Sequence, residues 1–409
     1  MTPSAAPLVA RTRRVDRDLD LLALAGGDGV LLERSRVGLA GRGVTLRVPL
    51  DEVDATLGAI EGDDEVGLPG TGAVAFGALP FRAVPSSTLV VPEIAWGRAD
   101  DGTRWVTTIG LADAPMPEVE DLCAVPASPP AAIPGQISVR PARSAAWWCE
   151  LVARATKAMA DADPDGLRKV VLAREVLVEA NAPFDRAAIL DRLRRAYPGC
   201  FLFHVDGFLG ASPELLVGRH GDVVRAQPMA GTAPRGGDPA TDARLGASLL
   251  ASPTYRQEHQ ITIDMVHDTL LPWCSYLDYE AEPSVVGVAN VQHLATLVEG
   301  RLSQPAPSIL ELVAALHPTP AVNGLPRDLA RAWIAEHEGF DRRHYAGTVG
   351  WVDGQGNGTW SVSIRCAEVQ GRQARLYAGN GIVADSDPDT ELAETQLKLQ
   401  AMLSALIRV

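Results

Sequence analysis

The alternation of apolar and polar residues predicts short β-strands in the first third of the chain. These runs are separated by Gly, Pro and Asp clusters, and they are GVTLRVPL (43–50), GAVAFGALPF (72–81), STLVVPEIAW (87–96) and TRWVTTIGL (103–111). A stretch rich in Pro and Ala follows at residues 117–136. Because proline interrupts helices and central strands, this stretch predicts a connector that divides the chain near residue 140.

Beyond residue 140 the apolar period switches between helical and strand-like spacing. Helical spacing is found at residues 144–161, 256–273, 308–316 and 391–407. Strand-like runs occupy residues 169–180, 200–211, 214–229, 345–353, 358–369 and 374–381. The strands come in groups joined by expected tight turns at GNG and DGQG, rather than alternating singly with helices. This order favours an antiparallel α+β fold over a doubly wound sheet.

Charge and composition exclude several classes of protein. The chain has 409 residues and a formal net charge of −14, without a local basic patch, which disfavours binding to nucleic acid or to an anionic membrane. No stretch approaches the ~18 uncharged apolar residues of a membrane span. The apolar LLALA after Arg13 and Arg14 is too short for an export signal. Five widely spaced cysteines argue against a disulfide framework or a zinc site and predict a cytoplasmic protein.

Four acidic or basic residues are candidates for chemistry, although each has a plainer interpretation. Glu394, with Glu391 and Lys398 on one face of the last predicted helix, is a candidate ligand for a hard divalent cation, or simply part of a solvated ion pair. Glu258 is a second candidate ligand, or a favourable charge in the first turn of a helix.

Lys169 begins a predicted strand and Glu214 follows the turn-like GASP. In isolation a solvated lysine and a turn glutamate are the commoner outcomes at such positions.

The segment Gly379 to Ala384 matches G-x-G-x-x-A, a pattern found in dinucleotide-binding proteins. The context contradicts that function, since the chain enters its last helix here instead of continuing to a second strand with an acid. The glycines are better explained by a tight turn or by backbone that lies against a ligand.

Taken together, the motifs resemble those of the chorismate-using enzymes, which include isochorismate, salicylate, anthranilate and aminodeoxychorismate synthases. The resemblance extends over residues 140–405 through KVVLAR, FLGASPELL, PMAGTAPR, RQEH, VQHL, LHPTPAVNGLP, YAGTVGW, WSVSIRCAEV, YAGNGIV and ELAETQLKL. It implies two large, mainly antiparallel β-sheets packed together, with helices outside. It also implies one domain over residues 1–409, in which residues 1–140 form a variable N-terminal part of the sheets and residues 141–409 carry the motifs.

Three positions distinguish the chemistries within this family. Lys169 stands where water-using members carry the lysine that activates water, and Ala230 stands where aminodeoxychorismate synthases place a nucleophilic lysine. Ala321 matches the alanine of isochorismate synthases, where related enzymes usually have a hydroxyl residue. The resemblance therefore implies an isochorismate synthase. The alternatives are a salicylate synthase, which continues to pyruvate elimination, and a non-catalytic chorismate-binding module.

The implied mechanism uses Lys169 as the general base and Glu214 as the general acid, each held in its uncharged form. By resemblance, Glu258 and Glu394 bind Mg²⁺, which bridges to a substrate carboxylate. Substrate-contacting positions are Gly231, Thr232, His293, Ala321, Tyr345, Arg365, Gly379 and Lys398. Chorismate and isochorismate are the expected partners, and the habit of the family predicts a monomer.

Three residues depart from the pattern of the family. Tyr255 stands where relatives often carry an acid, Thr254 replaces a common lysine, and Asn323 replaces a small residue near Ala321. These departures bear on the affinity for the metal and on the surroundings of the pocket. The sequence does not reveal which pathway consumes the product.

Overall fold

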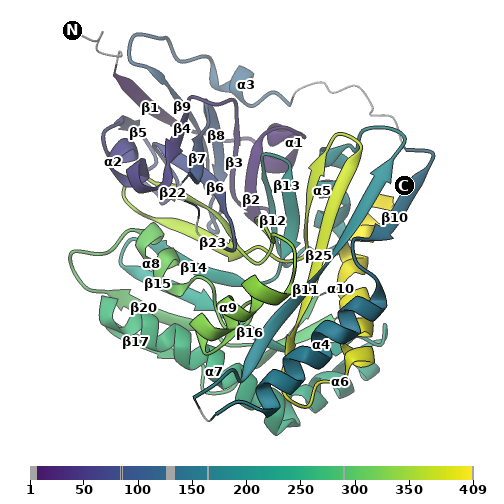
Figure 1. Ribbon diagram of the computed structural model, residues 1–409. Coiled ribbons are helices and arrows are strands. Elements are labelled where there is room, and N and C mark those ends of the chain that lie inside the picture. Colours follow the sequence, from purple (N-terminus) through teal and green to yellow (C-terminus); the bar gives the residue numbers. More distant parts are fainter. Residues whose placement is uncertain are drawn as a thin grey trace.

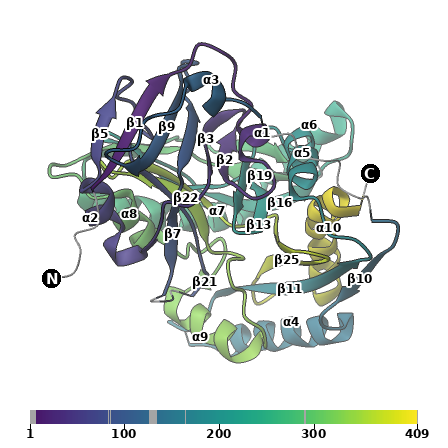
Figure 2. The same cartoon turned by 90° about the horizontal axis from the view of Figure 1, so that it is seen from above.

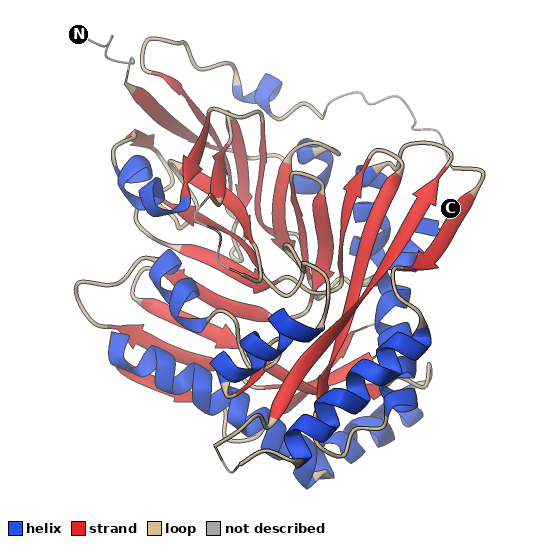
Figure 3. Ribbon diagram, viewed as in Figure 1, coloured by secondary structure: helices blue, strands red, loops and turns tan. Residues whose placement is uncertain are grey.

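The computed structural model describes residues 7–82, 84, 86–125, 134–163, 165–288 and 291–407. Two large β-sheets pack against one another, and helices lie around them (Figure 1; Figure 3). The sheets are antiparallel apart from the pairing of two N-terminal strands, β1 (Leu8–Arg14) and β5 (Glu61–Asp64). The predicted α+β class with two large, mainly antiparallel sheets is confirmed.

The larger sheet has 13 strands in the described part of the chain. Across the sheet they are β10 (Ile137–Pro141), β11 (Lys169–Ala180), β25 (Gln373–Ile382), β24 (Cys366–Gln370), β13 (Phe208–Ser212), β12 (Phe201–Val205), β2 (Val30–Arg34), β3 (Val37–Arg42), β8 (Ile94–Arg98), β9 (Arg104–Leu111), β1 (Leu8–Arg14) and β5 (Glu61–Asp64), with β21 (Gly324–Leu325) paired to β11.

The second sheet has nine described strands and a small third sheet has three. The second consists of β17 (Cys274–Tyr279), β20 (Val298–Leu302), β15 (Val223–Gln227), β14 (Leu215–His220), β23 (Gly358–Val362), β22 (Thr348–Asp353), β6 (Val74–Leu79), β7 (Thr88–Val91) and β4 (Leu46–Pro49). The third consists of β16 (Met229–Pro234), β19 (Val291–Ala295) and β18 (Ser284–Val288). Both large sheets combine strands from either side of residue 140, so the composition break does not separate them.

The helices surround the sheets. They are α1 (Leu21–Ala25), α2 (Val53–Gly58), α3 (Val119–Leu122), α4 (Ala145–Ala160), α5 (Arg186–Ala196), α6 (Pro239–Ala251), α7 (Pro253–Leu270), α8 (Ile309–Leu316), α9 (Arg327–His337) and α10 (Pro388–Ile407), with 3₁₀ turns η1 (Leu50–Glu52) and η2 (Leu271–Trp273). None of the described helices is both long and apolar enough to cross a membrane.

Two hydrophobic clusters hold these layers together. One lies between the large sheets and includes the buried Trp105 and Trp360. The other packs α1, α5 and α10 against the larger sheet through residues such as Leu193 and Met402. Burial of this apolar surface is the main favourable contribution to the folded state.

Strand β11 has an edge that other strands cover only in part. It pairs with β25 along its length, while its other edge meets β21 at residues 169–170 and β10 at residues 176–180. Between these two pairings, the buried ion pair of Arg342 and Glu338 forms hydrogen bonds with the backbone of β11. Arg342 donates to the carbonyl of Val171 at 2.6 Å, and Glu338 accepts from the Ala173 amide at 2.7 Å. Helices α4 and α9 flank β11, and α10 lies beside β25 (Figure 2).

The structure differs from the predicted elements at residues 379–381 and at the start of α7. Residues 379–381 (GNG) lie inside β25, as the strand-like run at 374–381 predicts, so the alternative of a tight turn there is wrong. DGQG does connect β22 to β23. Helix α7 begins at Pro253 instead of residue 256, because Ser252 caps its first turn and proline is favourable there.

The connector is not wholly without helix, since α3 makes one turn within it. Its residues 126–133 lie outside the described part of the chain.

Candidate active site

A cavity of about 580 Å³ opens where β11, β25, α7 and α10 meet the ends of β13 and β16. It is lined by every residue that the sequence singled out for catalysis, metal or substrate: Lys169, Glu214, Gly231, Thr232, Glu258, His293, Ala321, Tyr345, Arg365, Gly379, Glu394 and Lys398. These residues come from distant parts of the chain. The fold therefore brings the ordered motifs to one place.

Lys169 is the first residue of β11, and its side chain is only 7% exposed. Its Nζ lies 2.6 Å from Oε1 of Glu258, a residue of α7. Gly381 leaves room for this side chain, since a Cβ there would lie 2.7 Å from Cε of Lys169. The alternative that Lys169 is a solvated lysine is therefore wrong. Glu258 also lies beyond the first turn of α7, so the alternative of a favourable charge in the first turn of a helix is wrong.

Glu258 keeps its charge in this environment. Burial alone would raise the pKa of its carboxyl group, but the charge of Lys169, their hydrogen bond and the charge of Lys398 together hold the pKa below its ordinary value. The side chain of Glu258 is 30% exposed. An ionised, partly accessible carboxylate is available to a ligand in the cavity.

Glu214 lies between β13 and β14 and is only 3% exposed. Its backbone is fixed to β23, because its carbonyl oxygen accepts hydrogen bonds from the Ser361 hydroxyl at 2.9 Å and the Val362 amide at 3.1 Å. Burial raises the pKa of Glu214 to about 8, against the opposing effects of the Met229 amide, Lys169 and Arg365. The carboxyl group is therefore mostly protonated at neutral pH, as a general acid must be.

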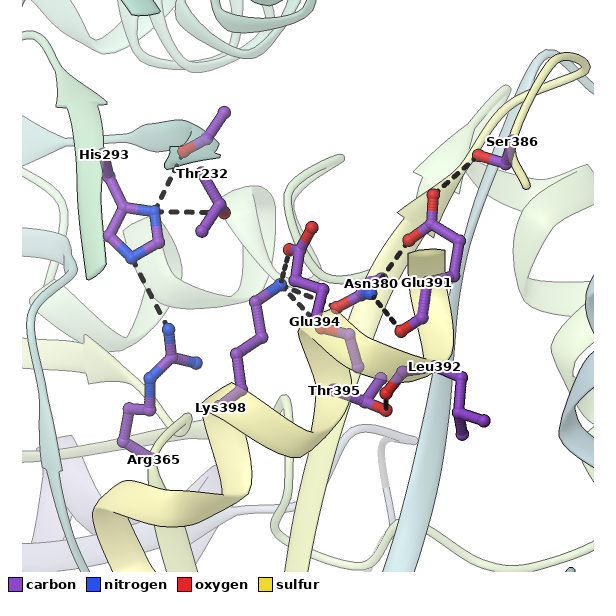
Figure 4. A network of polar contacts seen from close by, with 12 residues as sticks. Thr232, His293, Arg365, Asn380, Ser386, Glu391, Leu392, Glu394, Thr395 and Lys398 are labelled. Carbon is purple, nitrogen blue, oxygen red and sulfur yellow. Dashed lines mark hydrogen bonds and ion pairs between the residues drawn. The ribbon is translucent and has the colours of Figure 1, made fainter. Parts of the chain in front are cut away.

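Arg365 and His293 form a second polar group in the cavity (Figure 4). Nδ1 of His293 lies 2.9 Å from the carbonyl oxygen of Gly231, which accepts only, so we assign the ring proton to Nδ1. Burial, reinforced by the positive charge of Arg365, lowers the pKa of His293 to about 3 and keeps the ring neutral. Nε2 is then an acceptor for Arg365, whose Nη2 lies 3.5 Å away.

Arg365 is a buried cation with little anionic compensation. It is 8% exposed, and no Asp or Glu in the described residues forms an ion pair with it. An unpaired buried guanidinium is costly, and a ligand carboxylate would satisfy it in bidentate fashion. This observation points to an anionic ligand in the cavity.

Helix α10 contributes a cation and two acids at its cavity face (Figure 4). Nζ of Lys398 lies 2.7 Å from Oε1 of Glu394, so the ion pair considered from sequence exists. It is not a solvated pair, because the side chain of Lys398 is only 10% exposed. Burial lowers the pKa of Lys398, although the charge of Glu394 opposes this effect. Glu391 also lines the cavity.

The remaining predicted residues complete the wall. Tyr345 is buried and stacks on Tyr377 with ring centroids 5.2 Å apart. Its hydroxyl approaches Gly379 closely, since a Cβ on this glycine would lie 2.8 Å from the hydroxyl oxygen.

The departures from the family pattern fall in different places. Thr254 and Tyr255 line the cavity, and Tyr255 is 38% exposed. Asn323 is not among the residues that line it. Instead its carbonyl oxygen accepts from the amide of Val171 at 2.9 Å, and its side-chain amide donates to the carbonyl of Arg327.

Sequence reasoning missed Asn380, Gly381 and Ser386, which also line the cavity. The composition does draw attention to the two lysines of the cavity. The chain has only three lysines, and Lys169 and Lys398 are two of them. No comparable feature of the sequence singled out Asn380. Its partners, Glu391 and Lys398, lie on the helix that follows, and the local sequence does not show that they contact it.

Among the described residues, no cluster of three or more His, Cys, Asp or Glu side chains is arranged as a ready metal centre. The cavity instead offers two partly exposed carboxylates, Glu258 and Glu394 (30% and 32% exposed side chains). Mg²⁺ is typically held by one or two carboxylates together with waters and substrate oxygens. The donor set therefore fits Mg²⁺.

Similarity to known proteins extends over most of the chain. Residues 55–407 match the family model of chorismate binding enzymes. The chain is 41% identical over 350 residues to "Putative isochorismate synthase MenF" of Mycobacterium tuberculosis, which covers 82% of this chain and 87% of that protein. It is 43% identical over 251 residues to isochorismate synthase DhbC of Bacillus subtilis, covering 59% and 63% of the two chains.

A solved structure is similar over nearly the whole chain. The menaquinone-specific isochorismate synthase MenF from Escherichia coli superposes with a TM-score of 0.80 at 26% identity, covering 99% of this chain and 96% of that chain.

Proposed function

Since this chain belongs to the family of chorismate binding enzymes, we propose that it is an isochorismate synthase, which converts chorismate to isochorismate. The observation that carries the proposal is the cavity itself, where the buried, protonated Glu214 and the amine of Lys169 line one anion-binding pocket. Relatives that are named isochorismate synthases, one of them as putative, match most of the chain. They favour this function over a salicylate synthase or a non-catalytic chorismate-binding module.

The reaction adds water at C2 of the ring and removes the hydroxyl group from C4. We assign Lys169 as the base that takes a proton from the attacking water, and Glu214 as the acid that protonates the departing hydroxyl. The double bonds of the ring shift between these two carbons, so one water is gained and one is lost. Proton transfer by a positioned acid or base typically contributes about 10²- to 10⁴-fold to a rate.

Lys169 must first lose its contact with Glu258, because an amine accepts a proton only when it is uncharged and its lone pair is free. The ion pair at 2.6 Å occupies that nitrogen. If Glu258 held a divalent cation, Lys169 would be without this partner, and its ammonium proton would pass to solvent before the amine takes a proton from the attacking water.

The proposed substrate contacts follow from the chemistry of the wall. Arg365 and Lys398 supply positive charge for the carboxylates of chorismate, and His293 orients Arg365 through Nε2. The other proposed contacts are Gly231, Thr232, Ala321, Tyr345 and Gly379. We further propose that Ala321 favours release of isochorismate before pyruvate is eliminated.

We propose Mg²⁺ as the cofactor, with Glu258 and Glu394 as its protein ligands. When bound, Mg²⁺ supplies positive charge for a carboxylate of the substrate. Tyr255 stands one turn before Glu258 on α7 and adds no carboxylate to this set.

We propose that the protein is cytoplasmic and monomeric and that residues 1–409 form a single domain, of which residues 141–409 carry the site. The described cysteines are all unpaired, which supports a reducing compartment. Named relatives include menaquinone-specific and vibriobactin-specific enzymes, so proteins of this kind feed more than one pathway.

The test is to incubate the purified protein with chorismate and Mg²⁺ and to separate the products by chromatography. Isochorismate is the expected main product. A mixture dominated by salicylate and pyruvate would contradict the proposed end point, and absence of turnover would contradict the enzyme assignment.

A further inference from the structure

Asn380 lies at the centre of the polar network on the cavity face of α10 (Figure 4). It stands within β25, opposite Leu172 of β11, so the ladder of the sheet fixes its backbone. Its side chain is almost completely buried, at 2% exposure. It reaches two charged residues of α10, which follows β25 in the chain.

The orientation of the Asn380 amide is determined by its partners. Oδ1 accepts from Nζ of Lys398 at 2.8 Å. Nδ2 donates to the carbonyl oxygen of Glu391 at 2.9 Å and to its Oε2 at 2.8 Å. An ammonium group only donates, whereas a carbonyl or carboxylate oxygen accepts, so the reverse orientation would lose all three contacts.

Lys398 uses each of its three N–H groups, because its Nζ also lies 3.0 Å from the carbonyl oxygen of Gly379 and 2.7 Å from Glu394. If Glu394 turns toward a cation, Lys398 keeps two acceptors, the carbonyl of Gly379 and Oδ1 of Asn380. Without Asn380 this buried ammonium would keep only one. A buried charge with too few partners is costly, so Glu394 would then stay with Lys398.

Glu391 is engaged in a different way. Its Oε2 accepts from Asn380, and its Oε1 accepts from the Ser386 hydroxyl at 2.9 Å. Both carboxylate oxygens therefore have protein donors. Glu394 has no such donors among the described residues and pairs only with Lys398.

We propose that Asn380 is a positioning residue that assigns separate tasks to the acids of α10: it retains Lys398 in the cavity when Glu394 is released to bind a divalent cation, and it holds Glu391 away from that cation. This inference rests on the proposed function, since it takes Glu394 as a metal ligand and Lys398 as a contact for the substrate. It predicts that Asn380 affects binding of metal and substrate far more than turnover.

The experiment compares the wild type with Asn380→Ala. Mg²⁺ is titrated into the metal-free protein by calorimetry without substrate, and kcat and KM for chorismate are then measured at saturating Mg²⁺. We expect Asn380→Ala to bind Mg²⁺ about tenfold more weakly, or about 1.4 kcal/mol. KM should rise about tenfold, while kcat stays within about threefold of the wild type.

A further variant is the matched control. Asn357→Ala removes another buried asparagine, which bonds to Asp353 and does not line the cavity. It should keep Mg²⁺ affinity and KM within about threefold of the wild type. Thermal unfolding verifies that each variant folds, and Asn380→Ser, which is smaller but polar, is expected to show the same losses if Asn380→Ala does not fold.

Unchanged Mg²⁺ affinity and KM in a folded Asn380 variant would overturn the inference. An equal loss in Asn357→Ala would also overturn it, because the effect would then not depend on the contacts of Asn380 with Lys398 and Glu391. A wild type that binds no Mg²⁺ would refute both the metal assignment and this inference. A wild type that binds Mg²⁺ but leaves chorismate unchanged refutes only the proposed function, since the calorimetric comparison still tests Asn380.

Discussion

Replacement of Glu214 by glutamine tests the proposed general acid directly. Glutamine is close in size to glutamic acid and fits the same buried position, but it has no proton to give to the departing hydroxyl. We expect kcat to fall by about 10²- to 10⁴-fold, the range typical for loss of a positioned acid. Glu150→Gln, at an exposed position on α4, is the matched control and should leave kcat unchanged.

The burial of Glu214 also determines how strongly its protonation contributes to the free energy of unfolding. Its pKa rises from 4.5 to about 8 in the folded protein. At about 1.36 kcal/mol for each factor of ten, ionising this carboxyl group in the folded protein costs an extra amount on the order of 5 kcal/mol. Below pH 4.5 the carboxyl is protonated in both the folded and the unfolded chain, and its contribution to stability is fully present.

The sign of the pH dependence is then fixed. As the pH rises from 4.5 toward 8, the unfolded chain releases this proton and the folded protein keeps it, so the free energy of unfolding decreases. The loss is complete once the pH has passed the folded pKa of about 8. Glu214→Gln lacks this contribution, so its stability relative to the wild type should improve between pH 4.5 and 9, by an upper limit on the order of 5 kcal/mol.

Two assays measure these effects. Urea denaturation at about pH 5, 7 and 9 gives the free energy of unfolding of the wild type and of Glu214→Gln. The pH profile of kcat/KM for the wild type should decline about tenfold per pH unit above about 8, as the acid loses its proton. A wild-type profile that stays level to about pH 9.5 would refute the protonated acid. So would a variant that keeps more than a tenth of wild-type kcat.

Four further predictions concern the base, the product, the metal and the scaffold. Lys169→Ala should lower kcat at least about 10²-fold in a chorismate turnover assay, whereas Lys157→Ala, at the chain's remaining lysine, should not. Ala321→Thr should raise the ratio of pyruvate to isochorismate measured by chromatography, and an unchanged ratio would contradict its proposed role. Exhaustive chelation should abolish turnover, and added Mg²⁺ should restore it; activity that survives chelation would refute the metal assignment. Arg342→Met should lower the free energy of unfolding by about 3–5 kcal/mol in urea denaturation, because it leaves the buried carboxylate of Glu338 without its cation, and a loss below about 1 kcal/mol would show that the pair is not needed.

The fold was predictable where a periodic pattern determines one local structure. The runs at 43–50, 72–81 and 103–111 became β4, β6 and β9, because alternating side chains suit a strand with one buried face. The run at 87–96 is divided at Pro92 into β7 and β8, since two strands of different sheets share one apolar stretch. The GNG segment was misjudged because glycine is also used within a strand where another group approaches closely.

The members of the site were predictable from ordered motifs, but their interactions were not. Nothing in the local sequence pairs Lys169 with Glu258, which is 89 residues away, and their ion pair depends on how β11 and α7 pack. The raised pKa of Glu214 could not be predicted either, because it results from burial of the side chain in the folded protein. The ion pair of Lys398 and Glu394 could be read from i,i+4 spacing, but its enclosure in the cavity could not.

The charges of the cavity explain how a protein with a net charge of −14 is suited to a substrate with two carboxylates. Lys169 is offset by Glu258 and Lys398 by Glu394, so these pairs contribute little net charge. Glu214 is protonated and His293 is neutral, which leaves Arg365 as the principal uncompensated cation for a dianion. If Glu258 and Glu394 turn to a divalent cation, the charge of Lys398 becomes available to the substrate and Lys169 becomes available as the base. Metal and substrate affinity are therefore expected to be coupled, so the KM for chorismate should fall as the Mg²⁺ concentration rises. A KM independent of Mg²⁺ below saturation would contradict this account of the charges.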